Sequence, residues 1–243
     1  MELNKITDRI YWLPNEKEND RPVLAYIRGD KYSLAVDAGN SAEHVKKFYN
    51  GIKSLNMNLP DYTVITHWHW DHTFGMHAAE GKTIAGHLTN KKLKEIMQWK
   101  WSDSDMKKRL ETGEDIEMCD QCIKVEYENR NDIKVVPADI EFTGKLVIDL
   151  GGIHCVITEV DATHSDDSVF VYIPEERTLF VGDADCEDFY YNNGNYDEVK
   201  LRNMINMLEE IDFDMYVLGH DEPQKKDEVL DYLKERLEEI SKK

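Results

Sequence analysis

Residues 66–72 read Thr-His-Trp-His-Trp-Asp-His and place three imidazoles and a carboxylate within seven positions. Residues 62–65, Tyr-Thr-Val-Ile, come just before them and predict a short buried strand, because they are apolar and β-branched. Residues 73–79 follow, with helix-compatible composition after Gly75. The motif is therefore expected where a strand ends and a helix begins, a common position for functional side chains in layered α/β proteins.

The side chains of this motif are typical metal ligands. Neutral imidazole and carboxylate groups bind zinc, and iron or manganese also accept them. In an extended segment His67 and His69 point to the same side, because side chains alternate with a period of two. Asp71 and His72, where the chain turns, can then reach a second metal. Desolvating four such groups without a metal would be costly, which favours a metal site over a solvated polar turn.

The pattern His-x-His-x-Asp-His after a strand resembles the signature of the metallo-β-lactamase superfamily of metal-dependent hydrolases. The resemblance implies an α/β fold of four layers, an αβ/βα sandwich in which two sheets pack together with helices outside. The order of the predicted elements favours the same architecture, because two strand-rich halves are each followed by helices. We expect a single domain over residues 1–243, with a helical insertion around residues 90–130.

The resemblance also implies the remaining ligands, each of which follows a strand-like run. His67, His69 and His164 would hold the first metal. Asp71, His72 and His220 would hold the second, and Asp183 would bridge the two. Asp71 and Asp183 are the candidate catalytic residues. One departure from the family lies at residues 162–168, where the glycines that often surround the third histidine are missing.

Two divalent cations about 3.5–4 Å apart can share a water and lower its pKa toward neutrality. The expected activity is hydrolysis of an ester, thioester or lactone-type bond of a small molecule by a metal-bound hydroxide. Residues 219–222 resemble those of glyoxalase II, but the basic residues that grip glutathione in that type are not evident. Two alternatives stay open: an iron-containing redox enzyme of the same fold, of the sulfur dioxygenase or diiron type, and a non-catalytic metal-binding regulatory protein.

The 243 residues carry a formal net charge of −19, which argues against nucleic acid and anionic membranes as partners. Small anionic substrates remain compatible with it, because a metal site would be locally positive. The sequence shows no signal-peptide h-region and no apolar run of transmembrane length. With four cysteines, this favours a cytoplasmic location with reduced thiols. A small-molecule substrate is expected, and a homodimer is left open.

Several other segments carry specific expectations. Ser41 is expected to cap a helix whose buried face holds Val45, Phe48, Ile52 and Leu55, with His44 on the surface. Asp37 is expected to support the metal loop from behind, as the family resemblance implies. Residues 185–194 are expected to form a substrate wall or a surface loop. The remaining strands are predicted over residues 9–13, 22–28, 32–37, 83–86, 145–149, 153–160, 168–173, 178–181 and 215–218, and helices over residues 198–211 and 227–240.

Overall fold

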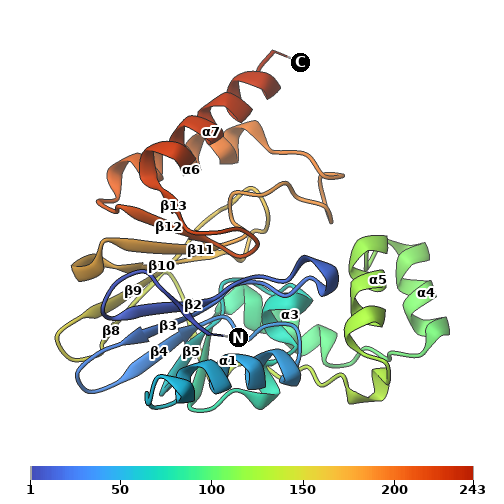
Figure 1. Cartoon of the computed structure of the whole chain (residues 1–243). Helices are drawn as coiled ribbons and strands as arrows, with labels where there is room; N and C mark the ends of the chain where they lie inside the picture. The colour runs from blue at the N-terminus through green and yellow to red at the C-terminus, as the bar shows by residue number, and fades with distance from the viewer. Residues whose placement is uncertain (1, 243) are drawn as a thin grey trace.

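The computed structural model describes residues 2–242, and two β-sheets packed against each other form its centre. Figure 1 shows helices covering the outer face of each sheet, so the layers follow the order helix, sheet, sheet, helix. This is the predicted four-layer α/β sandwich. None of the helices within residues 2–242 combines the length and the apolar composition that a transmembrane span requires.

The first sheet has seven strands in the order of the sequence. Its first four strands are antiparallel and its last three are parallel to the fourth. The strands are β1 (Asn4–Lys5), β2 (Ile10–Leu13), β3 (Leu24–Arg28), β4 (Ser33–Val36), β5 (Tyr62–Val64), β6 (Lys82–Gly86) and β7 (Ile140–Phe142).

The second sheet has six strands in the order β13-β12-β11-β10-β9-β8. All its neighbouring strands are antiparallel except the pair β11 and β12. The strands are β8 (Lys145–Asp149), β9 (His154–Glu159), β10 (Val169–Ile173), β11 (Thr178–Gly182), β12 (Met215–Leu218) and β13 (Gln224–Lys225).

The helices fall into three groups (Figure 1). One group lies on the first sheet, another on the second, and α4 and α5 stand beside the ends of the strands. The α-helices are α1 (Ala42–Ser54), α2 (Trp70–Thr73), α3 (His87–Ile96), α4 (Asp103–Thr112), α5 (Glu117–Glu126), α6 (Glu198–Glu210) and α7 (Lys226–Ile240). The short 3-10 helices are η1 (Lys17–Asn19), η2 (Met76–Ala78), η3 (Arg130–Asp132) and η4 (Pro174–Glu176).

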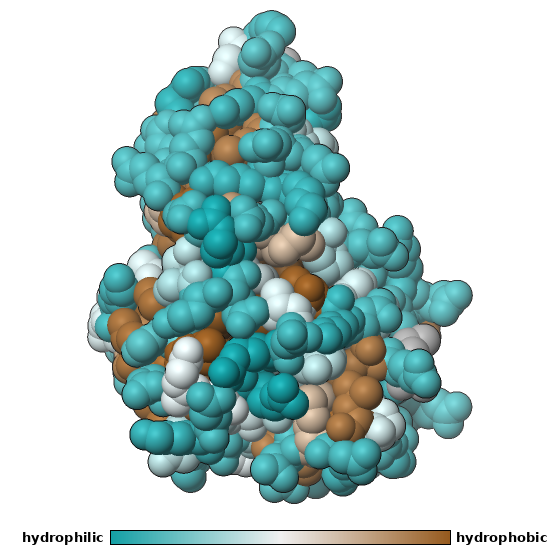
Figure 2. Space-filling view, turned by 60° about the vertical axis from the view of Figure 1, so that its left-hand side comes forward, coloured by the Kyte–Doolittle hydropathy of each residue, from teal (hydrophilic) through white to brown (hydrophobic). Residues whose placement is uncertain are grey.

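The main apolar core lies between the two sheets. Ile27 and Val36 of the first sheet and Ile157 and Val171 of the second belong to one cluster of buried side chains. Separate clusters lie under α1, around α3 to α5, and under α6 and α7. The helices therefore pack their apolar faces against these clusters. Hydrophilic side chains cover most of the outer face seen in Figure 2. Burying apolar area in this way is the main force that holds the layers together.

Most predicted elements are present, with local corrections. The structure confirms Ser41 as the cap of α1, since its hydroxyl accepts a hydrogen bond from the His44 amide. Leu55 is 41% exposed, because α1 ends one residue before it. The surface position expected for His44 was wrong, because its side chain is fully buried. Residues 73–79 form only the end of α2 and the 3-10 turn η2.

The segment around residues 90–130 is helical, as predicted, but consists of three helices. All three lie in the connection between the parallel strands β6 and β7, and the first, α3, begins directly after β6. Gly113 ends α4 with a φ of 73°, a left-handed conformation that glycine adopts without strain. The next helix, α5, then turns back toward the ends of the strands, where it forms one wall of the site described below.

Candidate metal centre

The strand ends deliver the predicted site residues to one edge of the sandwich. β5 ends at Val64 and leads into the motif of residues 66–72, which begins the short helix α2. The parallel pair β11 and β12 ends at Gly182 and Leu218, immediately before Asp183 and His220. His164 lies in the turn between β9 and β10. All seven predicted residues lie in this region, in two groups.

The first group consists of three buried histidines, His67, His69 and His164. One nitrogen from each ring lies within 4.8 Å of the others. Nε2 of His164 is 2.9 Å from Nδ1 of His69, and the ring centroids of His67 and His69 are 4.5 Å apart. Three imidazoles that converge in this way match the ligand number of a zinc site with an open fourth position.

The second group consists of Asp71, His72, Asp183 and His220. Oδ2 of Asp71 lies 3.0 Å from Nε2 of His220 and 3.1 Å from Nε2 of His72. Oδ2 of Asp183 lies 3.3 Å from Nε2 of His220 and 3.4 Å from Nε2 of His72. Two carboxylate oxygens and two imidazole nitrogens therefore face one point.

Asp183 also reaches the first group. Its Oδ2 is 3.8 Å from Nε2 of His164, a distance similar to those that separate it from the histidines of the second group. The carboxylate thus lies between the two groups, in the place where a ligand shared by two cations would stand.

Several ligand atoms of the site have no hydrogen-bond partner within residues 2–242. They are Nε2 of His67, Nε2 of His72 and Oδ1 of Asp183, all of which are buried. Buried polar atoms normally have a partner, because leaving one unsatisfied costs about 1–3 kcal/mol. Imidazole nitrogens and carboxylate oxygens are the ligands that zinc, iron and manganese accept, so the residues present fit divalent metals.

Neighbouring groups fix the orientation of the histidines. Oδ2 of Asp37 lies 2.7 Å from Nδ1 of His72, which leaves Nε2 of that ring facing the site. The hydroxyl of Thr66 lies 3.1 Å from Nδ1 of His67. The backbone carbonyl of Glu187 lies 2.8 Å from Nδ1 of His164. Such contacts fix the ring position and tautomer of metal-binding histidines.

Burial and charge divide the histidines into two kinds. Burial lowers the pKa of His67 and His69 well below the usual value, so both rings are neutral, as ligands must be. Burial also opposes the charged form of His72, but Asp71, Asp183 and Asp37 outweigh it and hold the pKa of His72 well above the usual value. The second group therefore attracts positive charge strongly.

Two more carboxylates lie close to the centre. Burial, reinforced by the charge of Asp71, raises the pKa of Asp20 to about 6, and burial raises the pKa of Asp185 to about 7. Oδ1 of Asp20 lies 3.7 Å from Nδ1 of His220. Asp20 was not predicted as a site residue, because nothing in the local sequence links residues 17–21 to the distant metal motif.

A cavity of about 170 Å³ opens onto the two groups. Its walls come from Ile116, Met118 and Cys119 in and before α5, and from Phe189 and Tyr190 in the loop after β11. The loop of residues 185–194 thus contributes to the wall, which was one of its two predicted roles. Ile116 and Met118 were not predicted, because an insertion helix cannot be docked from sequence alone.

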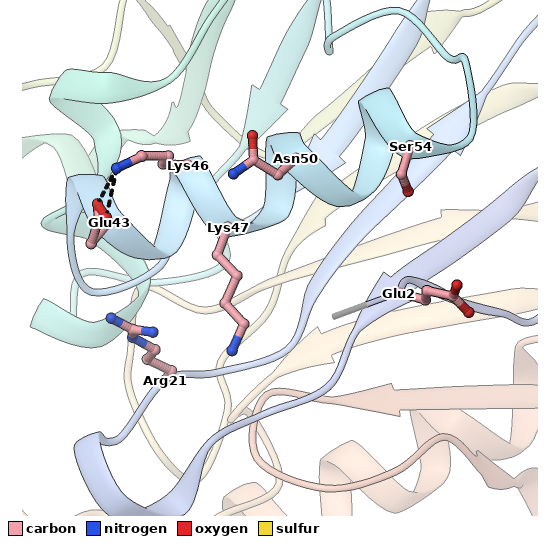
Figure 3. A pocket seen from close by; sticks show the side chains of 7 residues that line it. All are labelled: Glu2, Arg21, Glu43, Lys46, Lys47, Asn50 and Ser54. Carbon is pink, nitrogen blue, oxygen red and sulfur yellow. Dashed lines mark hydrogen bonds and ion pairs between the residues drawn. The ribbon is translucent and has the colours of Figure 1, made fainter.

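Two tryptophans of the helical segment lie outside the two groups of candidate ligands. Trp99 and Trp101 both pack against the guanidinium group of Arg109, whose carbon is 4.5 and 4.6 Å from their ring centroids. Cys119 and Cys122 are free thiols on α5, and Cys119 also lines the cavity. A larger cavity, of about 490 Å³, lies along α1 and contains none of the candidate metal ligands (Figure 3).

Comparisons with solved structures agree on the fold. A double mutant of a secondary alkyl sulfatase matches with a TM-score of 0.72 and 14% identity over 98% of this chain. The chain spans only 41% of the length of that sulfatase, whose parent enzyme comes from a Pseudomonas species. A metallo-β-lactamase from Pontibacter korlensis matches with a TM-score of 0.67 and 17% identity, over 98% of both chains. The metallo-β-lactamase DIM-1 matches with a TM-score of 0.65 and 18% identity, over 99% of both chains.

At these identities the solved structures establish the fold and not the activity. No curated protein sequence matches the chain. The family model of the metallo-β-lactamase superfamily, however, matches residues 20–220, which include every candidate ligand from His67 to His220. Members of this superfamily typically bind divalent metals, and most of the chain lies within the match. The chain therefore belongs to the metallo-β-lactamase superfamily.

Proposed function

We propose that this protein is a binuclear metal-dependent hydrolase that cleaves an ester, thioester or lactone-type bond of a small molecule. The observation that supports it most directly is the position of Asp183. Its Oδ2 lies 3.3–3.8 Å from histidine nitrogens of both groups, as a ligand shared by two metals would. The unpartnered Nε2 atoms of His67 and His72 also support the proposal.

Each predicted residue has a role in this proposal. His67, His69 and His164 hold one metal, Asp71, His72 and His220 hold the other, and Asp183 binds both. When bound, two divalent cations supply a Lewis acid and an activated water. Asp71 faces the cavity, and its carboxylate can accept a proton released by the reacting water. Zinc is the proposed metal, because five imidazoles and two carboxylates suit its preference for nitrogen and oxygen ligands.

The shape of the cavity favours a small, partly apolar substrate. Ile116, Met118 and Phe189 line it, and Met118 and Phe189 are about half exposed at its mouth. An apolar acyl group would bury these side chains on binding, which favours association. Water would be displaced from the same wall, so that the reacting bond is surrounded by side chains rather than by bulk solvent. The four cysteines are free thiols, which suits the reducing cytoplasm proposed as its location.

The experiment combines metal analysis with a panel of thioesters, lactones and phosphodiesters. We expect about two zinc ions per chain and turnover of the carboxylic esters or thioesters. His69→Ala and Asp183→Asn should remove most of the bound metal and nearly all turnover, while far-ultraviolet circular dichroism stays close to wild type. His77→Ala is the matched control, since His77 lies on η2 and bonds the carbonyl of Phe74 outside the site.

Three outcomes would overturn the proposal. Full activity of His69→Ala or Asp183→Asn would place the chemistry elsewhere. Bound iron with a visible absorption band and oxygen-dependent product formation would favour the redox alternative. Bound metal with no turnover across the whole panel would favour a regulatory metal-binding protein.

A further inference from the structure

His220 differs from other candidate ligands in how its ring is held. Its side chain is 31% exposed, whereas that of His72 is fully buried. Nε2 of His220 faces Asp71 and Asp183 at 3.0 and 3.3 Å, so Nδ1 is the nitrogen that points away from the site. In His72 and His164 the corresponding Nδ1 has a partner within 2.8 Å. Nδ1 of His220 makes no hydrogen bond with any protein group within residues 2–242.

The carboxylate of Asp20 lies next to this nitrogen. Its Oδ1 is 3.7 Å from Nδ1 of His220, which is too long for a hydrogen bond but close enough for direct electrostatic attraction. The side chain of Asp20 is 22% exposed and lines the 170 Å³ cavity. Among the described residues 2–242, it accepts no hydrogen bond and forms no ion pair with a lysine or arginine. The ring of His220 is therefore the protein group with which this carboxylate can pair.

The segment that carries Asp20 also holds the backbone around His220. Residues 14–23 connect β2 to β3. In this segment, the side-chain amide of Asn15 donates a hydrogen bond to the carbonyl of His220 at 2.9 Å. The backbone amide of Val23 donates to the carbonyl of Gly219 at 2.6 Å. Two hydrogen bonds thus fix the backbone of His220 to the same segment, and rotation of the two side chains changes the distance between the carboxylate and the ring.

The residues on either side of Asp20 are tied to the rest of the molecule. The side-chain amide of Asn40 donates to the carbonyl of Asn19 at 2.8 Å, and the side-chain amide of Asn19 donates to Glu126 of α5 at 2.8 Å. Arg21 forms an ion pair with the same glutamate at 2.8 Å. A group that is already held in place loses little freedom when it forms a bond, so Asp20 is well prepared to bind a neighbouring donor.

The backbone of Asp20 is in a conformation that favours another residue type. Its φ of 53° and ψ of 41° are left-handed, and this conformation costs a residue with a Cβ more than it costs glycine. Glycine would therefore suit the backbone at this position better than aspartate. Residues that break a local rule in this way cluster at functional sites. This favours a role for the carboxylate itself over a role in the turn.

We propose that Asp20 is a positioning residue for the second metal group: its carboxylate accepts a hydrogen bond from Nδ1 of His220 and keeps Nε2 directed into the site. A carboxylate on the far nitrogen of a metal-binding imidazole fixes the orientation and tautomer of the ring. Asp37 already makes this contact with His72, so both histidines of the second group have a carboxylate behind them. The inference rests on the proposed binuclear function, because it takes His220 as a ligand.

The first metal group has neutral partners instead. The hydroxyl of Thr66 lies 3.1 Å from Nδ1 of His67, and the backbone carbonyl of Glu187 lies 2.8 Å from Nδ1 of His164. Removing the charge of Asp20 should therefore weaken the second group and leave the first nearly unchanged. This difference between the two groups separates positioning of His220 from a general effect on the protein.

The test is a zinc titration of protein labelled with ¹⁵N-histidine, which follows both groups by nuclear magnetic resonance. The His220 signal is identified as the one missing from His220→Gln. In wild type we expect its Nδ1 proton to exchange slowly with water once zinc is bound, because the proton is held by Asp20. In Asp20→Asn this proton should exchange faster, and the second zinc should bind about tenfold or more weakly, while the first binds nearly as in wild type.

Two further variants separate positioning from folding. Asp20→Gly removes the carboxylate but relaxes the left-handed backbone. Without metal it should unfold at the same urea concentration as wild type or a higher one, yet bind the second zinc as weakly as Asp20→Asn. Glu18→Gln is the matched control, because it removes an exposed charge from the same short helix η1 and should bind both zinc ions like wild type. Equal weakening of both zinc ions in Asp20→Asn would overturn the positioning role.

The role of Asp20 and the proposed function fail in different ways. If wild type and Asp20→Asn bind two zinc ions equally tightly and the Nδ1 proton exchanges equally fast, Asp20 does not position His220 and the binuclear function stands. If the variant loses affinity for the second zinc but wild type hydrolyses no ester, thioester or lactone, the hydrolase function is wrong and the role of Asp20 stands. If zinc leaves the His220 signal unchanged in wild type, His220 is not a ligand and both are wrong.

Discussion

The carboxylate of Asp37 lies 2.7 Å from Nδ1 of His72, and its other oxygen accepts a hydrogen bond from the Thr66 amide at 2.7 Å. One side chain at the end of β4 thus holds both the first and the last residue of the metal motif. Asp37 also has a φ of 63°, an uncommon conformation for a residue other than glycine. The role expected for Asp37 behind the metal loop therefore has a geometric basis.

Asp37→Asn should weaken metal binding without removing a ligand. The asparagine can still accept one hydrogen bond, but it no longer places a negative charge on the imidazole of His72. We expect zinc affinity to fall about 10–100-fold, measured by competition with a chromophoric chelator. Asp61→Asn is the matched control, because Asp61 accepts from the Ser33 amide at the other end of β4. Equal affinities in the two variants would contradict this role of Asp37.

Gly219→Ala should reduce metal occupancy by crowding the site. A Cβ at this position would lie 2.1 Å from Oδ1 of Asp183 and 2.9 Å from Cε1 of His72, so both side chains must move. We expect less bound zinc by mass spectrometry and a smaller loss of thermal stability on chelator addition than in wild type. Gly86→Ala is the control, since its Cβ would lie 3.0 Å from the flexible end of Glu159 and would otherwise make only ordinary contacts at 3.7 Å. Unchanged zinc content in Gly219→Ala would show that the site can absorb the methyl group.

Glu126→Gln should loosen the wall that α5 contributes. The carboxylate of Glu126 accepts hydrogen bonds from Arg21 at 2.8 Å, from Asn19 at 2.8 Å and from Ser41. When residue 126 is uncharged, Arg21 keeps its ion pair with Glu16 but loses the one with Glu126. We expect the free energy of unfolding to fall by about 2–3 kcal/mol. KM should rise as well, because α5 carries Met118 and Cys119 of the cavity wall. Urea denaturation and steady-state kinetics measure the two effects.

The control for this prediction is Glu128→Gln, which changes a neighbouring exposed glutamate. A stability loss of the same size in both variants would mean that net charge, and not the contacts of Glu126, is responsible.

His44 should make the protein sensitive to mild acid. Its ring is fully buried, neither nitrogen has a hydrogen-bond partner among residues 2–242, and burial lowers its pKa to about 3. The unfolded chain binds a proton near pH 6.5 while the folded protein does not. His44 therefore costs no stability above pH 6.5, but the folded protein loses stability as the pH falls from 6.5 toward 3, with a slope of about 1.4 kcal/mol per pH unit.

His44→Leu removes this titration. The stability difference between variant and wild type, measured by urea denaturation, should shift in favour of the variant by about 2 kcal/mol between pH 7 and pH 5. Parallel pH profiles would show that His44 is protonated or hydrogen-bonded in the folded protein.

The prediction of strands succeeded where apolar runs were long enough to show a pattern. Residues 169–173 and 178–182 are almost continuously apolar, and both form strands at the centre of the second sheet. β1, β7 and β13 were not predicted, because two or three residues carry no detectable periodicity. His44 was misplaced for a related reason: helical spacing shows which residues share a face, but not how deeply the helix end is covered.

The sequence by itself determined the chemistry available at this site. Short stretches of sequence contain the spacing of His67, His69, Asp71 and His72 on one turn. They also contain the single candidate ligands that follow later strands. Only the tertiary structure decided that Asp183 lies between the two groups and that Asp20 lies beside His220. These relations depend on sheet register and on how loops far apart in sequence pack, and neither is encoded in any short stretch of residues.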